Sequence, residues 1–122
     1  MGNTFKKAEK LKSKKIISSL FDGGEKMKHF PLLMVYTQCS LLENVSIQAG
    51  FSVSKRRFKN AVDRNRIKRQ MREAYRLQKP FLKISEPQQF AVLFIYIHHQ
   101  KLPFSQIEEA MKQCLKQLAT SN

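Results

Sequence analysis

The residues best suited to chemistry in this sequence are the arginines and lysines between residues 55 and 76. That segment contains ten Lys or Arg against two acidic residues, which gives it a net charge of +8. A helical arrangement brings five polar or basic side chains together at spacings of three and four: Asn65, Lys68, Arg69, Arg72 and Arg76. Guanidinium groups are planar donors that bind phosphate and stack on bases. The spacing therefore predicts a cationic stripe suited to the backbone of a nucleic acid.

A basic stripe on a helix has two other common explanations, a solvated surface and a membrane contact. A solvated helix face usually mixes charges of both signs, but here Glu73 is almost the only acidic residue after Asp63. A helix that lies on a membrane needs an exposed apolar side, and the apolar side of this helix is expected to face the core. Nucleic acid is favoured, and no membrane partner is expected.

Residues that could perform hydrolysis or hold a metal are not grouped in this sequence. His98 and His99 are adjacent, and on a strand they would point to opposite faces, so they could not easily chelate one ion. Asp63 lies three residues after Asn60, a position typical of helix capping, and no second carboxylate has the spacing of a two-metal site. We therefore predict no catalytic residue, no metal ligand and no cofactor bound by the protein alone.

The overall composition supports one folded, strongly basic domain. The 122 residues carry 23 Lys or Arg against 9 Asp or Glu, a net charge of +14, and segments 1–15 and 55–76 hold +13 of it. We expect a single domain over residues 1–122 with a basic N-terminal arm of about residues 1–10. Cys39 and Cys114 form no metal or disulfide motif, which favours a reducing cytoplasm.

Apolar periodicity predicts the elements that must position these residues. Helices are expected over residues 7–22, 60–78 and 105–119, and strands over 30–38, 45–53 and 89–97. Asn60 is expected to cap the second helix, and Gly23-Gly24 to end the first in the manner of a C′ glycine. This order predicts a two-layer α/β sandwich.

Residues 50–76 read GFSVSKRRFKNAVDRNRIKRQMREAYR. A strand that ends in SVSK leads into a helix that carries Arg64-Asn65-Arg66, followed by Ile67-Lys68-Arg69. This segment resembles the signature of the protein subunit of bacterial ribonuclease P. The segments LKSKKIISSLFDGG and MVYT also resemble the first helix and second strand of that family.

The resemblance implies an α+β fold, a two-layer sandwich with helices packed on one face of a mixed four-stranded sheet. The implied order is α-β-β-β-α-β-α, with a left-handed βαβ crossover against the usual rule. The implied RNA-binding residues are Lys55, Arg56, Arg57, Arg64, Asn65, Arg66, Lys68, Arg69, Arg72 and Arg76. The implied residues for the single-stranded 5′ leader of precursor tRNA are Ile17, Phe21, Tyr36, Ser52 and Lys55.

The resemblance also implies a division of labour. The catalytic RNA subunit would perform the hydrolysis with magnesium, and the protein would bind that RNA and precursor tRNA as a monomer in a one-to-one complex. Ile17 stands where the family often has an aromatic residue. Phe21 and Tyr36 are expected to share a groove, although either could instead be a core residue.

Three other functions share parts of this pattern. A ribosomal or other structural RNA-binding protein would have the same electrostatics. A DNA-binding regulator could place a basic helix in the major groove, but here a strand precedes the basic helix, so no DNA partner is expected. A stand-alone nuclease is disfavoured because the sequence has no carboxylate cluster.

Overall fold

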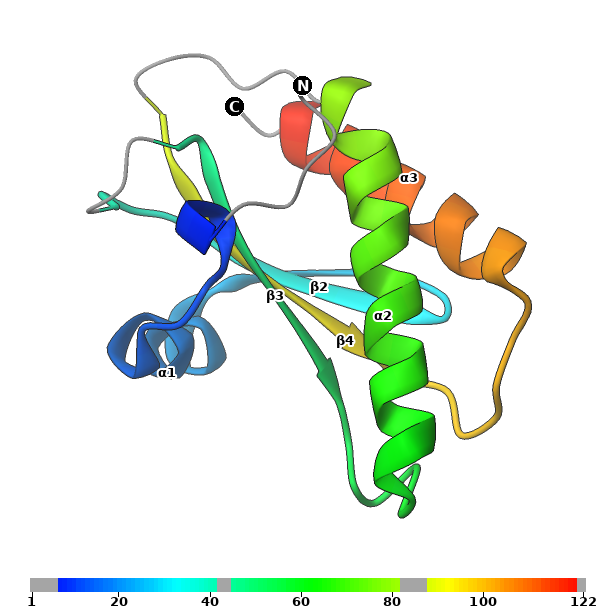
Figure 1. The fold of residues 1–122 in the computed structure, drawn as a ribbon. Helices are drawn as coiled ribbons and strands as arrows, with labels where there is room; N and C mark the ends of the chain where they lie inside the picture. Colours follow the sequence, from blue (N-terminus) through cyan, green and yellow to red (C-terminus); the bar gives the residue numbers. More distant parts are fainter. Residues whose placement is uncertain (1–6, 42–44, 82–87, 121–122) are drawn as a thin grey trace.

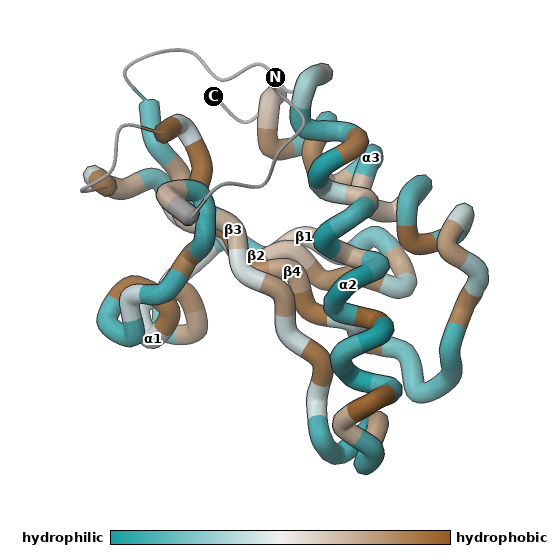
Figure 2. The backbone as a smooth tube through the Cα atoms, viewed as in Figure 1, coloured by the Kyte–Doolittle hydropathy of each residue, from teal (hydrophilic) through white to brown (hydrophobic). Residues whose placement is uncertain are grey.

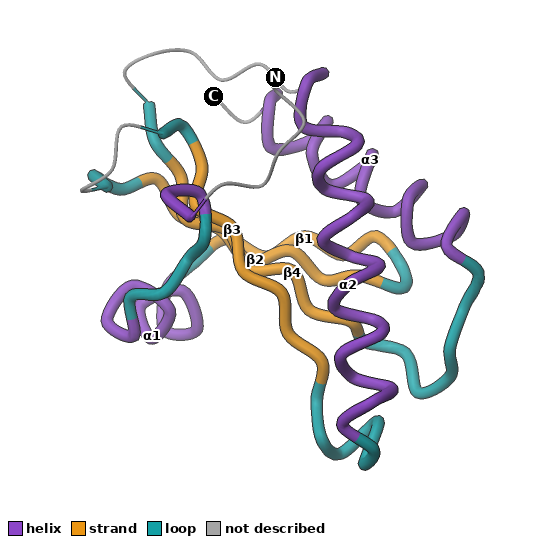
Figure 3. Tube along the Cα trace, viewed as in Figure 1, coloured by secondary structure: helices purple, strands orange, loops and turns teal. Residues whose placement is uncertain are grey.

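The computed structural model describes residues 7–41, 45–81 and 88–120. Its helices and strands follow the order α-β-β-β-α-β-α expected from the family resemblance (Figures 1 and 3). The helices are α1 (Lys14–Gly23), α2 (Ala61–Gln78) and α3 (Phe104–Thr120), with short 3-10 turns η1 (Lys7–Glu9) and η2 (Lys79–Phe81). The strands are β1 (Glu25–His29), β2 (Leu32–Gln38), β3 (Ile47–Val53) and β4 (Phe90–Tyr96). Within these described ranges no helix is long and apolar enough to cross a membrane.

The four strands form one mixed sheet in the order β1-β2-β4-β3. β2 pairs antiparallel with β1 and β4, whereas β3 runs parallel to β4. In Figure 1 the chain descends β3, rises through α2 and then descends β4, so the two parallel strands are joined through α2. The predicted α+β fold with a mixed four-stranded sheet is therefore confirmed.

The two faces of the sheet are covered by different helices. Alternate residues of β2 and β4, such as Met34 and Phe94, belong to a core that includes α2 and α3. Their neighbours Val35 and Leu93 belong instead to a smaller cluster with Leu20 of α1. The prediction of helices on one face thus holds for α2 and α3, while α1 lies on the opposite face (Figure 3).

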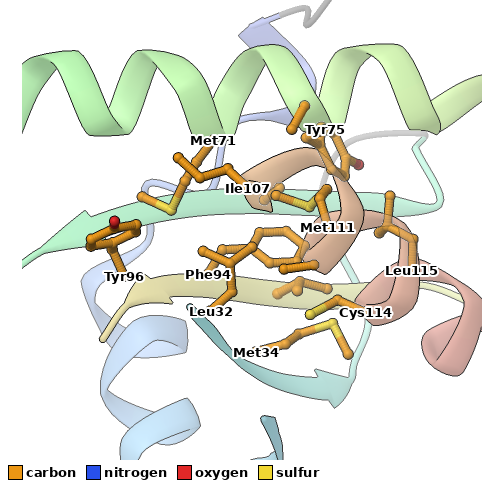
Figure 4. Close-up of a cluster of buried hydrophobic side chains, with 14 of the residues drawn as sticks. Leu32, Met34, Met71, Tyr75, Phe94, Tyr96, Ile107, Met111, Cys114 and Leu115 are labelled. Carbon is orange, nitrogen blue, oxygen red and sulfur yellow. The ribbon is translucent and has the colours of Figure 1, made fainter. Parts of the chain in front are cut away.

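The larger core contains the bulkiest buried side chains of the described residues (Figure 4). The Phe94 ring stacks on Phe51 of β3, with centroids 5.7 Å apart, and also contacts Tyr75 of α2. The hydroxyl of Tyr96 donates to the carbonyl oxygen of Gln100 at 2.7 Å, so its polar end is satisfied at the edge of the core. Each such side chain contributes about 1.5–3 kcal/mol when fully buried. This core fixes α2 against the sheet.

The first helix begins later than predicted, at Lys14 rather than at residue 7. The hydroxyl of Ser13 accepts a hydrogen bond from the N–H of Ile16 at 3.2 Å and caps α1. The preceding residues lie along β3, where the N–H of Leu11 donates to the carbonyl oxygen of Ala49 at 3.0 Å. Leu11 is buried in the smaller cluster. The residues expected to form the first turns of this helix thus lie along the edge of β3 instead.

The segment between α1 and β2 contains a strand that the residue pattern did not indicate. β1 has the sequence EKMKH, and its side chains are mostly exposed because it is an edge strand. Helix α1 ends at Gly23 and is capped by Gly24, as predicted, but Gly24 has φ −71° and is not the left-handed C′ glycine that was expected. A Cβ at Gly24 would lie 2.7 Å from the carbonyl oxygen of Leu20, so close packing explains this glycine.

Candidate nucleic-acid interface

Helix α2 positions most of the predicted RNA-binding residues. Asn60 caps it, because its side-chain oxygen accepts from the N–H of Val62 at 2.9 Å, as predicted. The buried side of α2 packs on the sheet and on α3 through four residues: Ile67, Met71, Ala74 and Tyr75. The hydrophilic colour that dominates α2 in Figure 2 marks the rest of its surface. A well-packed helix thus presents a polar face to solvent.

The cationic stripe lies on that polar face. Asn65, Arg69 and Arg72 are exposed and Lys68 is half-buried, while Arg66 is exposed beside them. The guanidinium carbon of Arg72 lies 6.0 Å from the centroid of the Phe51 ring, so this side chain reaches over β3. The stripe therefore continues toward the edge of the sheet. The structure places the first four residues of the predicted stripe on this polar face, with Arg66 beside them as predicted.

A tight turn presents the predicted cations that precede α2. Lys55, Arg56 and Arg57 are exposed, whereas Phe58 is buried and its ring contacts Tyr96. The carbonyl oxygen of Ser54 accepts hydrogen bonds from the N–H groups of residues 57 and 58, at 3.2 and 3.1 Å. The turn is thus anchored at both ends and holds three cations next to the start of α2.

Arg64 differs from its neighbours because it is used within the protein. Its Nη1 donates to the carbonyl oxygens of Phe58 and Lys59, at 2.7 and 3.0 Å. These bonds fix the anchored turn relative to α2. Arg64 therefore helps to position the cationic turn, and its Nη1 is already occupied by hydrogen bonds within the protein.

Arg76 is also engaged inside the protein. Its Nε and Nη2 donate to the two carboxylate oxygens of Glu73, at 3.0 and 2.5 Å. This hydrogen bonding lowers the pKa of Glu73 and raises the pKa of Arg76. The last residue of the predicted stripe is thus paired with an acid, and the strongest positive surface lies toward the N-terminal half of α2.

Three of the five residues predicted for a 5′ leader lie on α1 or on the α1 side of the sheet, called the open face below: Ile17, Phe21 and Ser52. Phe21 projects from α1 with 54% of its surface exposed, and Ile17 lies half-buried one turn earlier. Ser52 is half-buried on β3, and its neighbours Phe51 and Val53 belong to the opposite side. Leu33 and Ile95 are half-buried on this face and were not predicted. Both lie in strands whose sequences are almost continuously apolar, so the sequence could not show which of their residues face α1.

Tyr36 does not join this surface. It is 6% exposed, belongs to the core under α2 and α3, and its ring lies 6.3 Å from that of Phe90. Because Val35 faces α1, Tyr36 must face the other side of β2. The prediction that Phe21 and Tyr36 share a groove was wrong, and Tyr36 is a core residue.

The basic N-terminal segment is partly docked on the domain. Residues 1–6 lie outside the described residues, but Gln48 Nε2 donates to the carbonyl oxygen of Ala8 at 3.0 Å. Glu9 pairs with Lys79 at the end of α2, with Oε1 and Nζ 2.7 Å apart. Lys12 and the first two residues of α1, Lys14 and Lys15, are exposed. Ala8 and Glu9, near the end of the expected basic arm, are therefore held against β3 and the end of α2.

The histidines and acids that could suggest hydrolysis have other neighbours. His98 and His99 follow the end of β4, and their ring centroids lie 4.7 Å apart, so the prediction of opposite faces was wrong. Asp63 pairs with Lys101 at 2.8 Å. Within the described parts of the chain, no three His, Cys, Asp or Glu residues are grouped as metal ligands.

Comparisons with known proteins agree with this geometry. A sequence model of the family described as Ribonuclease P matches residues 5–119. The ribonuclease P protein component of Porphyromonas gingivalis is 36% identical over 116 residues, which cover 93% of this chain and 85% of the relative.

Solved structures show the same fold. The ribonuclease P protein of Staphylococcus aureus superposes with a TM-score of 0.72 at 24% identity, covering 95% of this chain and all of that one. The Thermotoga maritima protein also gives a TM-score of 0.72, at 19% identity, covering 89% and 96%. Given the match over nearly its whole length, the chain belongs to the ribonuclease P protein family.

Proposed function

We propose that this chain is the protein component of the ribonucleoprotein endoribonuclease that removes the 5′ leader from precursor tRNA in the cytoplasm. The observation that carries the proposal is the exposed cationic face of α2, held rigidly by the core of a family member. The protein acts as a monomer bound to one catalytic RNA.

The catalytic RNA docks on the first half of α2 and the turn before it. Arg66 and Arg69 are exposed there, Arg72 is exposed one turn further along, and the anchored turn adds three further cations. Phosphate contacts of this kind give affinity and orientation without reading sequence. Because the buried side of α2 is packed in the core, the helix offers these side chains with little loss of backbone entropy on binding.

The 5′ leader lies on the open face of the sheet. Phe21 offers an exposed ring, and Ile17, Leu33 and Ile95 provide apolar surface beside it. Lys55 follows β3 and places a cation near Ser52 on the same strand. Stacking on one ring accepts any base, which suits a protein that receives many different leaders.

We assign the hydrolysis to the catalytic RNA, which binds the magnesium ions. Magnesium keeps several waters and is bound through phosphates in such sites, and it neutralises charge that develops during phosphodiester cleavage. The residues of this chain hold the RNA and the leader in place. Their contribution is to substrate binding and to the stability of the complex.

A three-arm cleavage assay tests the proposal. The RNA that co-purifies with tagged protein is isolated, and precursor tRNA is incubated with protein alone, RNA alone and both, at low magnesium. We expect cleavage only with both. The matched control is the triple variant Arg66→Ala, Arg69→Ala, Arg72→Ala, which should fold but fail to activate the RNA.

Two results would contradict it. Cleavage by rigorously RNA-free protein would show that the chemistry belongs to the chain itself. Recovery of ribosomal RNA as the co-purifying species, with no activation of cleavage, would support the alternative of a structural RNA-binding protein.

A further inference from the structure

An open pocket lies away from both surfaces described above. It has a volume of about 330 Å³ and lies between the turn that joins β1 to β2 and the first half of α3. Its lining includes the Phe30 ring and four polar side chains of α3: Ser105, Gln106, Glu109 and Gln113. None of these residues contributes to the cationic stripe or to the open face of the sheet. The pocket is therefore a separate feature of the surface.

Three rings beside the pocket form a short ladder: Phe30 and His99 are exposed and His98 is half-buried. Phe30 has 54% of its surface exposed, although it sits next to a well-packed core. Its ring meets that of His98 edge to face at 5.0 Å, and His98 lies 4.7 Å from His99. An exposed aromatic ring next to a pocket is the arrangement on which unpaired bases stack.

The polar lining can recognise the edge of a base. Glu109 carries the one carboxylate of the pocket, and Gln113 Nε2 donates to its Oε2 at 2.8 Å, which orients it. A carboxylate only accepts hydrogen bonds, and guanine is the base whose Watson–Crick edge offers two adjacent N–H donors. The hydroxyl of Ser105 and the amide of Gln106 can serve the remaining polar atoms of that base.

The pocket is connected to the RNA-binding end of α2. Lys101, three residues after His98, pairs with Asp63 in the first turn of α2 at 2.8 Å. Three residues of chain span at most about 11 Å. The ring ladder thus lies close to the start of the cationic stripe, so an RNA docked on α2 passes within a few nucleotides of Phe30.

We infer that this pocket binds one unpaired guanine of the RNA that docks on α2. The base stacks on Phe30, and its N1–H and N2–H groups donate to the Glu109 carboxylate. The inference rests on the proposed RNA-binding function and adds a base-specific contact to a surface that otherwise recognises phosphates.

Short RNA probes test the inference on the full-length protein. The fluorescein-labelled pentamers UUGUU, UUAUU and UUUUU are titrated in anisotropy experiments, at a salt concentration that suppresses phosphate-only binding. We expect UUGUU to bind about tenfold more tightly than either other probe, as one stacked and hydrogen-bonded base should. Phe30→Ala and Glu109→Gln should each abolish this preference, whereas Phe30→Trp should keep the stacking. Arg69→Ala lies outside the pocket and serves as a control that should keep the preference for UUGUU.

Equal affinity for the three probes would overturn the inference, as would a preference that survives both Phe30→Ala and Glu109→Gln. Equal binding of UUAUU and UUGUU would overturn the assignment to guanine. Thermal melting of each variant checks folding, which both substitutions should preserve because Phe30 and Glu109 are exposed. Cleavage of precursor tRNA by the wild-type complex separates the two proposals. Cleavage activity without guanine preference would contradict only the guanine-binding inference. Guanine preference without cleavage activity would contradict only the proposed function.

Discussion

The two faces of the central sheet are built from the same alternating strands but have different burial. Under α2 and α3, among the described residues, 21 buried residues form one continuous core. On the α1 face the corresponding cluster contains five, and the side chains around it stay half-buried or exposed. Most of the stability of the domain therefore comes from one face.

The difference shows how a domain of this size can both fold and bind an extended polymer. A single helix of ten residues cannot cover a four-stranded sheet, so α1 leaves apolar surface open around Phe21. The larger core under α2 and α3 compensates for this exposed apolar surface, because its buried aromatic side chains supply stability that the open face does not. Mutations on the two faces should accordingly separate stability from binding.

The largest expected effect concerns two adjacent residues of β4. Phe94→Ala removes a fully buried ring that stacks on Phe51, and we expect a loss of about 3–5 kcal/mol in the free energy of unfolding. Leu93→Ala, on the α1 face, should cost about 2 kcal/mol, because the open surface around it can relax. Urea denaturation measures both. Equal losses would show that the two faces contribute alike.

The next effect concerns binding rather than stability. Phe21→Ala should weaken the binding of a substrate with a leader of several nucleotides by about 1–3 kcal/mol. The binding of a substrate with almost no leader should not change. Its melting temperature should stay near that of the wild type, since the ring is 54% exposed. Tyr36→Ala is the matched control and should lower the melting temperature, because Tyr36 is buried. If Phe21→Ala weakens both substrates equally, the ring has no role in leader binding.

Helical periodicity was sufficient to predict α2 but not the faces of β2. Ile67 and Met71 repeat at helical spacing against a background of charges, so both sides of α2 could be assigned from the sequence. The run LLMVY in β2 is apolar at every position, and therefore alternation could not show which residues face α1. Pairing of Tyr36 with Val92 in the sheet decides that question. This register is a tertiary property.

The internal partners of the basic residues differ in the same way. The pair Glu73 and Arg76 is local, three residues apart on one helix, and a sequence can indicate it. The bonds from Arg64 to the carbonyl oxygens of Phe58 and Lys59 depend on the path of the turn, which no spacing rule supplies. The strand β1 was missed for a related reason, since an edge strand needs few apolar residues.

A smaller effect compares two arginines of the same helix. If about six phosphates are neutralised, log affinity for the catalytic RNA should fall with log salt at a slope of roughly −4 to −5. Arg69→Ala should reduce the magnitude of that slope by about one, because Arg69 is exposed. Arg76→Ala should change it by less, because Glu73 already neutralises Arg76. A wild-type slope near −1, or equal changes for both variants, would contradict the proposed docking surface.

The smallest expected effect concerns the point where the N-terminal segment is fixed. The Glu9 and Lys79 side chains are only 12% and 18% exposed, so their ion pair is shielded more than a surface pair. Glu9→Gln should lower the free energy of unfolding by about 1 kcal/mol and loosen residues 7–11 from β3.

Glu25→Gln provides the matched control, because it makes the same change in net charge at an exposed position of β1. Removing either acid raises the positive charge of the domain by one, so only the difference between the two variants reports on the pair. Amide hydrogen exchange at Leu11, whose N–H donates to Ala49, should accelerate in Glu9→Gln and stay unchanged in Glu25→Gln. Equal exchange in both variants would mean that the backbone pairing with β3 holds this segment without the ion pair.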